Sequence, residues 1–265
     1  MRLLRSSVKN ALDKMGYELN RKRPEVRSGA TFPSDPFEAQ RVLLDRAKKS
    51  DIVIYDVGAN KGQTTKKYRS LFPSSKIYSF EPFPETAEIL REKLKDDSDV
   101  HVVQKAVSDK NDTEDFFVNG LDATNSLLSR PKDARRYFPK KGETLDVITV
   151  DTVTIDSLRS EIELGRIDVL KFDIQGGELK ALHGAKETLS EGGLSVIYTE
   201  IMFVPHYEKG PLFHEVWSYL SKYGFSLFDI YNLHRAQNGQ LRYGDALFIC
   251  ESLRDRVIDL FPDEP

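Results

Sequence analysis

The sequence predicts an α/β fold in which a mostly parallel β-sheet is covered by helices on both faces. From residue 37 onward, short apolar runs rich in Val and Ile alternate with longer segments of helical periodicity. Several of these runs contain few polar residues, which is typical of strands buried on both faces of a parallel sheet. Near the C-terminus, Asn238–Gly239 separates two strand-like segments as a hairpin turn does, so we expect the last strand to be antiparallel.

The first half of the pattern alternates helix and strand. The run at 51–58 ends in a glycine, and the segment 84–96 begins with a proline, which favours the first turn of a helix. A strand, a helix and a second parallel strand imply a right-handed crossover. The sequence predicts helices at 36–49, 64–72 and 84–96, and strands at 51–58, 76–82 and 100–109.

Residues 110–150 interrupt this rhythm. The segment 112–120 alternates like an edge strand, a polar stretch follows, and 145–155 is strand-like. The alternation then resumes up to the last strand. The remaining predictions are helices at 156–162, 177–193 and 212–224, and strands at 168–174, 194–201, 226–232 and 245–250.

Composition excludes several classes of protein. The chain has 265 residues, a formal net charge of -3 and a single cysteine, Cys250, so it has no internal disulfide and no C-x-x-C zinc site. Its near-neutral balance argues against a dedicated nucleic-acid binder. It has no uninterrupted apolar run long enough to span a membrane and no secretory signal at its start, so we expect a cytoplasmic protein.

The N-terminus differs in charge from the rest. Residues 1–30 carry eight Lys and Arg but three Asp and Glu, and apolar residues recur at helical spacing over 4–15. We expect residues 1–36 to be a basic amphipathic helix and a linker. Such a helix either docks on the main domain or makes peripheral contact with a membrane surface. The main domain is expected at 37–255, with a basic candidate lid at 120–142, followed by a tail at 256–265.

The strongest motif is DVGANKG, residues 56–62, which lies between a predicted buried strand and a predicted helix. Gly58 allows a sharp turn, and Gly62 allows backbone to approach a ligand or a neighbouring helix. Glu81 ends the second predicted strand, where a carboxylate can accept hydrogen bonds from both ribose hydroxyls. The glycine spacing differs from the dinucleotide fingerprint, and Asp56 would repel a phosphate but could pair with an ammonium group. These features favour S-adenosylmethionine, a nucleoside cofactor without phosphate.

The motifs resemble those of the FkbM family of class I methyltransferases. The resemblance covers roughly residues 50–250 and implies a Rossmann-like fold with a seven-stranded sheet whose last strand is antiparallel. It also implies methyl transfer from S-adenosylmethionine to a hydroxyl, often of a sugar or glycan or of a natural product. The matching segments are IVIYDVGANKGQTT, IYSFEPFPETAEIL, VVQKAVSD, ITVDTVTIDSL, IDVLKFDIQGGELKALHGA, YTEI and GDALFIC.

The resemblance also assigns residues to the site. The loop after the first strand and the ends of the next three strands are implied to hold the cofactor, with Asn125 and Ser126 in a polar loop nearby. One position departs from the pattern, because the family often reads D-V-E-G where this chain has Gln175 in place of the glutamate. The implied cofactor-binding residues are Asp56, Gly58, Ala59, Asn60, Gly62, Glu81, Pro82, Phe83, Ala106, Val107, Ser108, Ser126 and Asp173.

Transfer to an alcohol oxygen requires a base within hydrogen-bond reach of the acceptor. Asp173, Glu200 and His206 are the candidates, because they lie at or beyond the carboxyl ends of predicted strands. Two carboxylates could also help to hold a magnesium ion, although no metal site is assigned.

Two other functions remain open from the residues alone. A nicotinamide (NAD)-dependent oxidoreductase could use a related sheet, and a non-catalytic module could keep the fold and bind the cofactor without turnover. The expected partner is a small-molecule or glycan substrate with a hydroxyl. The sequence leaves open whether the protein is a homo-oligomer.

Overall fold

The computed structural model describes residues 32–132, 143–161 and 166–258 of the chain. The described residues from Ser34 onward belong to one compact unit. The expected N-terminal helix, most of the linker, residues 133–142 of the expected lid and the end of the expected tail lie outside the described residues.

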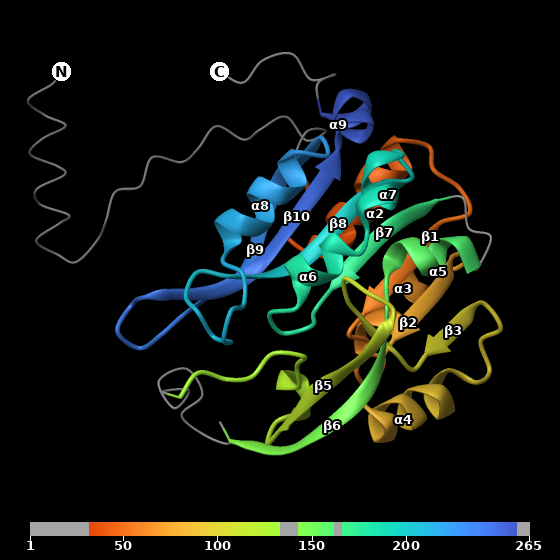
Figure 1. Cartoon of the computed structure of the whole chain (residues 1–265). Helices are drawn as coiled ribbons and strands as arrows, with labels where there is room; N and C mark the ends of the chain where they lie inside the picture. The colour runs from red at the N-terminus through yellow and green to blue at the C-terminus, as the bar shows by residue number, and fades with distance from the viewer. Residues whose placement is uncertain (1–31, 133–142, 162–165, 259–265) are drawn as a thin grey trace, which may run out of the picture. The chain divides into compact units, whose positions relative to one another are not determined.

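The main sheet has seven strands in the order β3-β2-β1-β7-β8-β10-β9 (Figure 1). β10 runs antiparallel to both of its neighbours, and the other paired strands are parallel. The predicted seven-stranded, mostly parallel sheet with an antiparallel last strand is therefore confirmed. The strands are β1 (Val53–Val57), β2 (Lys76–Phe80), β3 (Val100–Val103), β7 (Ile167–Phe172), β8 (Leu194–Met202), β9 (Phe225–Arg235) and β10 (Leu241–Cys250).

Helices cover both faces of this sheet, as predicted. Successive residues of a strand point to opposite faces. Ile197 of β8 packs in a cluster with residues of α5 to α8, whereas the ring of Tyr198 contacts Phe37 of α2. The helices are α2 (Pro36–Arg46), α3 (Gln63–Leu71), α4 (Pro84–Leu94), α5 (Ile155–Glu161), α6 (Glu178–His183), α7 (Lys186–Ser190), α8 (Phe213–Ser221) and α9 (Glu251–Val257).

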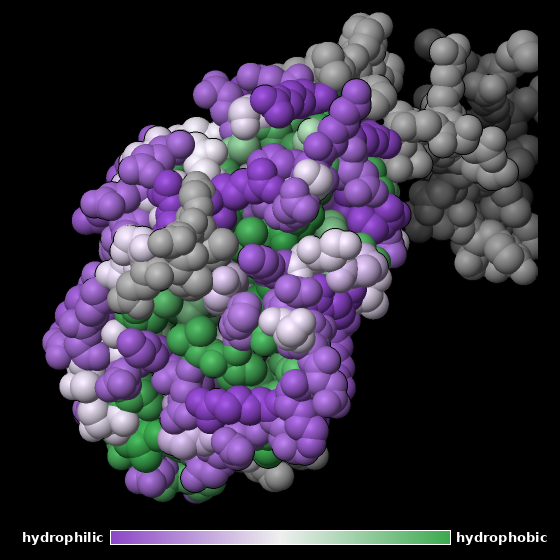
Figure 2. Space-filling model, turned by 90° about the vertical axis from the view of Figure 1, so that its right-hand side faces the viewer, coloured by the Kyte–Doolittle hydropathy of each residue, from purple (hydrophilic) through white to green (hydrophobic). Residues whose placement is uncertain are grey.

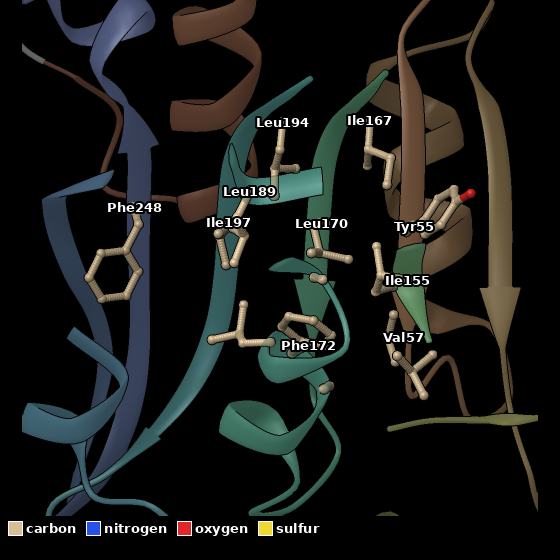
Figure 3. Packing of buried hydrophobic residues seen from close by; sticks show 14 of the residues in the cluster. Tyr55, Val57, Ile155, Ile167, Leu170, Phe172, Leu189, Leu194, Ile197 and Phe248 are labelled. Carbon is tan, nitrogen blue, oxygen red and sulfur yellow. The ribbon is translucent and has the colours of Figure 1, made fainter. Parts of the chain in front are cut away.

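The core explains why the apolar runs are strands. Every residue of β1 and of β7 is buried, as expected for central strands covered on both faces. Figure 3 shows side chains of β1, β7 and β8 packed together, among them Val57, Phe172 and Ile197. Burying an apolar side chain of this size contributes about 1.5–3 kcal/mol. The ends of these strands are thus held in a rigid arrangement.

One predicted helix is broken in the structure. The segment 177–193 forms two short helices, α6 and α7, with Gly184 between them. A Cβ atom at Gly184 would lie 2.2 Å from the carbonyl oxygen of Ser108, so only glycine allows this close approach. The break therefore results from a contact with a segment far away in the sequence.

A second sheet has three strands in the order β4-β6-β5. The interrupting segment supplies β5 and most of β6, and β4 comes from the end of the predicted strand 100–109, which the structure divides between the two sheets. Its strands are β4 (Ala106–Val107), β5 (Asp112–Asn119) and β6 (Thr144–Val153). The predicted edge strand β5 pairs antiparallel with β6 rather than with the main sheet. Phe116 and Val150 pack with Ala106 in a small apolar cluster of their own. This sheet lies below the main sheet in Figure 1.

Polar residues dominate the face seen in Figure 2, with hydrophobic residues visible between them. This agrees with a chain in which 31% of residues are charged. In the described part of the chain, no helix is both long enough and apolar enough to cross a membrane.

Candidate active site

A cavity of about 300 Å³ lies at the carboxyl ends of β1, β2 and β7, next to the small sheet. This edge is where open α/β sheets bind ligands, and the volume lies at the lower end of the range for small-molecule sites. The cavity is lined by Val57, Gly58, Ala59, Asn60, Gln63, Thr64, Phe80, Glu81, Pro82, Lys105, Ala106, Val107, Phe116, Ala123, Asn125, Leu127, Asp173, Ile174, Gln175 and Gly177.

The turn after β1 forms one wall of the cavity. The backbone N–H groups of Gly58 and Ala59 both donate to the carbonyl oxygen of Phe80, at 3.0 and 2.9 Å. Gly58 has a φ of 78°, and a Cβ atom there would lie 2.0 Å from the carbonyl oxygen of Asp173. Glycine is thus required both for the backbone conformation and for the contact with the end of β7.

Glu81 forms the next part of the wall, at the end of β2. Its Oε2 accepts from the N–H of Asn60 at 3.0 Å, and its Oε1 accepts from the N–H of Phe83 at 2.9 Å. Burial raises the pKa of Glu81 to about 7, although these two N–H groups lower it. A carboxylate has room for further hydrogen bonds beyond these two, so each oxygen can still accept one from a ligand.

At the end of β7, Asp173 lines the cavity with its side chain 50% exposed. The side-chain amide of Gln175 donates through Nε2 to Asp173 Oδ1 at 3.0 Å and to Glu200 Oε2 at 2.8 Å. The hydroxyl of Tyr207 donates to Gln175 Oε1 at 2.7 Å. One amide therefore connects two carboxylates and a buried tyrosine.

The small sheet supplies apolar wall residues that the sequence analysis missed. Phe116 of β5 and Leu127 line the cavity together with the expected Ala106 and Val107. The alternating sequence of β5 indicated that the strand has an apolar face. It did not show that this face borders the cavity, because that depends on a pairing between distant segments.

Nine of the implied or candidate site residues line the cavity, whereas the implied Phe83 and Ser108 do not. The nine are Gly58, Ala59, Asn60, Glu81, Pro82, Ala106, Val107, Asn125 and Asp173.

Asp56 requires a correction, because it does not line the cavity. Its side chain is fully buried, and its Oδ1 lies 2.9 Å from Nζ of Lys171, a lysine on β7 that is itself 4% exposed. Its Oδ2 accepts from the hydroxyl of Thr65 at 2.7 Å. Asp56 therefore pairs with an ammonium group of the protein, where the sequence analysis expected one of the cofactor.

Gly62 and Ser126 are also not part of the cavity wall. A Cβ atom at Gly62 would lie 2.8 Å from a methyl group of Leu90, so this glycine lets α3 approach α4 rather than a ligand. Ser126 is buried, and its hydroxyl donates to the carbonyl oxygen of Gln175 at 2.8 Å. Both residues support the wall from behind.

Glu200 and His206, two of the candidate bases, do not line the cavity either. Glu200 lies behind Asp173 and Gln175, and its pKa is well above the ordinary value because it is buried and because Asp173, Glu178 and Asp245 are negatively charged. His206 is 5% exposed, and its Nδ1 lies 3.1 Å from the carbonyl oxygen of Val204. Of the three candidates, Asp173 alone borders the cavity.

The described part of the expected lid packs against the domain. Arg130 is 9% exposed and donates to the hydroxyl of Thr124. Tyr207 donates to the carbonyl oxygen of Thr124 at 3.3 Å. Arg130 is thus bound within the protein, and it is not a surface charge.

Comparison with known proteins finds a family match over more than half of the chain. The family described as "Methyltransferase FkbM domain" matches residues 56–227. The 2-O-methyltransferase NoeI of Sinorhizobium fredii is 29% identical over 189 residues, which cover 69% of this chain and 76% of NoeI. The AMB antimetabolite synthetase AmbE of Pseudomonas aeruginosa is 30% identical over 161 residues, which cover 51% of this chain and 8% of AmbE.

Two solved structures are similar in fold to this chain over most of its length. The precorrin-6y C5,15-methyltransferase of Geobacter metallireducens has 15% identity and a TM-score of 0.43, over 86% of this chain and 95% of that one. The fibrillarin of Aeropyrum pernix, solved with bound S-adenosyl-L-methionine, has 13% identity and a TM-score of 0.42, over 76% of this chain and 67% of that one. These likenesses add nothing about function.

The family match spans the turn after β1, Glu81 and Asp173, which all border the cavity. It identifies the chain as an S-adenosylmethionine-dependent methyltransferase and not an oxidoreductase. The chain belongs to the FkbM methyltransferase family.

Proposed function

We propose that this protein transfers the methyl group of S-adenosylmethionine to a hydroxyl of a sugar or glycan, with Asp173 as the base. The observation that carries this proposal is the position of two carboxylates on one cavity wall. Glu81 and Asp173 both border the cavity, at the ends of β2 and β7. One suits the ribose of the cofactor, and the other suits the acceptor.

The cavity provides matching surroundings for each part of the cofactor. Glu81 would accept hydrogen bonds from the ribose hydroxyls, since each of its oxygens has already one backbone donor and can take another. The apolar wall of Ala106, Phe116 and Leu127 suits a flat purine ring. Asp173 then faces the positively charged methionine part and the acceptor.

The bound cofactor supplies a methyl group on a positively charged sulfur, which leaves as a neutral thioether. The protein must align the acceptor oxygen and take its proton. Asp173 is half exposed on the cavity wall, whereas neither Glu200 nor His206 lines the cavity, and His206 is 5% exposed. Asp173 is therefore the carboxylate that can reach the acceptor hydroxyl.

Magnesium does not fit the carboxylates at this edge. Mg²⁺ requires oxygen ligands in near-octahedral geometry, whereas Gln175 directs its two amide hydrogens at Asp173 and Glu200. Within the described ranges, no three His, Cys, Asp or Glu side chains come together to hold a metal.

The acceptor class rests on the relative NoeI, which is a 2-O-methyltransferase. Transfer of radiolabelled methyl from S-adenosylmethionine to a panel of methyl glycosides tests it, with matching deoxy sugars that each lack one hydroxyl. If a single deoxy sugar fails to accept the methyl group, the hydroxyl that it lacks is the methylated position. Transfer to amines but to no glycoside would contradict the proposal.

Binding of the cofactor is tested separately by thermal shift. A ligand at about 100 times its dissociation constant adds roughly 2.7 kcal/mol of stability, which corresponds to about 5–10 °C for a chain of this size. We expect this rise with S-adenosylmethionine and S-adenosylhomocysteine and none with NAD. Binding without transfer to any acceptor would instead favour the non-catalytic module.

A further inference from the structure

Gln175 makes an unusual set of contacts at the edge of the cavity. Its Nε2 donates to Asp173 Oδ1 at 3.0 Å and to Glu200 Oε2 at 2.8 Å. An amide nitrogen has two hydrogens, so both are used. The opposite orientation of the amide would place its oxygen against two carboxylates, which repel it. The carboxylates therefore determine which way the amide points.

The rest of Gln175 is held equally firmly. Its Oε1 accepts from Tyr207 at 2.7 Å, and its carbonyl oxygen accepts from the buried hydroxyl of Ser126 at 2.8 Å. Its φ of 56° is uncommon for a residue other than glycine. Such a conformation persists only where the surroundings fix it. The amide cannot turn away without breaking its hydrogen bonds to Asp173, Glu200 and Tyr207.

Two carboxylates that lie this close repel each other unless something positive lies between them. A bound cation often fills this position, and here the partial positive charge of an amide NH₂ group does so. Among the described residues, Lys171 forms an ion pair with Asp173, with its Nζ 3.9 Å from Asp173 Oδ2. It is already engaged with Asp56 and with the carbonyl oxygen of Gly58.

We propose that Gln175 is a positioning residue, whose amide takes the place of a cation between Asp173 and Glu200 and so holds the Asp173 side chain turned toward the acceptor. This proposal rests on the proposed role of Asp173 as the base. The proposal predicts that this pair of carboxylates binds no metal ion in the wild type, and that exchanging the amide for a carboxylate creates a metal site.

The first test needs no acceptor. Mg²⁺, Ca²⁺ and Tb³⁺ are titrated into the wild type, Gln175→Glu and the double variant Gln175→Glu/Asp173→Asn, by calorimetry and Tb³⁺ luminescence. We expect Gln175→Glu to bind one ion at least tenfold more tightly than the wild type, and the double variant to lose this gain. A stoichiometric Mg²⁺ site in the wild type that Asp173→Asn removes would overturn the proposal.

The second test uses Gln175→Met, which keeps the length of the side chain but donates no hydrogen bond. We expect kcat to fall at least tenfold while the Kd for S-adenosylmethionine changes less than threefold. The acidic limb of the kcat profile should move to higher pH, because carboxylates that lose two donors hold their protons more tightly. The groups that face this pair are Lys171, Glu178, Tyr207, Tyr243 and Asp245.

Gln104→Met is the matched control, because Gln104 is an exposed glutamine outside the cavity that accepts from Arg91. It should leave kcat and the pH profile unchanged. If Gln175→Met behaves like this control while Asp173→Asn abolishes transfer, the positioning role is wrong and the base assignment stands. If Asp173→Asn keeps full activity, the proposed function of Asp173 fails first.

Discussion

Nζ of Lys171 lies 2.9 Å from Oδ1 of Asp56, and neither side chain is more than 4% exposed to solvent. The same ammonium group donates to the carbonyl oxygen of Gly58 at 3.0 Å and lies 3.9 Å from Asp173 Oδ2. This buried pair therefore connects β1, the turn after it and the end of β7. Asp56 of the DVGANKG motif is therefore paired within the protein.

Breaking this pair should destabilise the fold. Removing one partner leaves a buried charge without its counterion, which costs about 3–5 kcal/mol. We expect Asp56→Asn and Lys171→Met each to lower the free energy of unfolding by this amount, measured by urea denaturation. The double variant should lose less than the sum of the two. A stable Asp56→Asn protein that has lost only cofactor affinity would instead indicate a direct contact.

Glu81→Gln should weaken binding of S-adenosylmethionine about 10- to 100-fold. A hydrogen bond to a charged group contributes about 1.5–3 kcal/mol, and the amide oxygen cannot accept from two backbone donors and two ribose hydroxyls. Calorimetry measures the affinity. Glu85→Gln, an exposed acid in the first turn of α4, is the matched control and should bind like the wild type.

Cofactor affinity should also depend on pH through Glu81. Its pKa in the free protein is about 7, and the ionised form accepts the ribose hydroxyls better. Affinity should be full above pH 7 and should fall below it, approaching about tenfold per pH unit. The slope should vanish in Glu81→Gln. Affinity that rises on acidification would show that Glu81 binds the ribose as the neutral acid.

Asp173→Asn should separate binding from catalysis. The amide keeps the shape of the side chain but cannot take a proton, so kcat should fall about 10²- to 10⁴-fold. The Kd for S-adenosylmethionine should change much less, because Glu81 and the apolar wall are untouched. Radiolabelled methyl transfer and calorimetry measure the two quantities. Equal losses in both would mean that Asp173 serves the cofactor alone.

Gly58→Ala should damage both the fold and the cofactor site. The new Cβ would lie 2.0 Å from the carbonyl oxygen of Asp173, in a residue with a φ of 78°. We expect a loss of more than about 2 kcal/mol in the free energy of unfolding, together with loss of cofactor binding. Gly192→Ala is the control, because its φ is 69° but nothing lies within 4 Å of the new atom. It should cost about 1 kcal/mol from backbone strain alone.

The main sheet could be predicted from the sequence because its signals are local. The apolar runs of β1 and β7 identify central strands, and a turn containing Gly58 at the end of β1 identifies a ligand-binding edge. The positions of Glu81 and Asp173 at the cavity could be predicted because each directly follows a buried strand. Parallel strands bring such positions to one edge whatever the surrounding detail.

The tertiary structure decided what depends on contacts between distant segments. Local periodicity showed that β5 is a strand but not that it pairs with β6 and supplies Phe116 to the cavity. The sequence predicts that Asp56 binds a ligand, whereas the structure shows that it pairs with the ammonium group of Lys171. In the sequence, Gln175 stands out only because it lacks the negative charge of the family's usual glutamate. In the structure, its side-chain amide donates hydrogen bonds to two carboxylates and so links them. Hydrogen bonds and ion pairs of this kind join residues that are not related by any regular spacing in the sequence. Only the folded chain therefore reveals them.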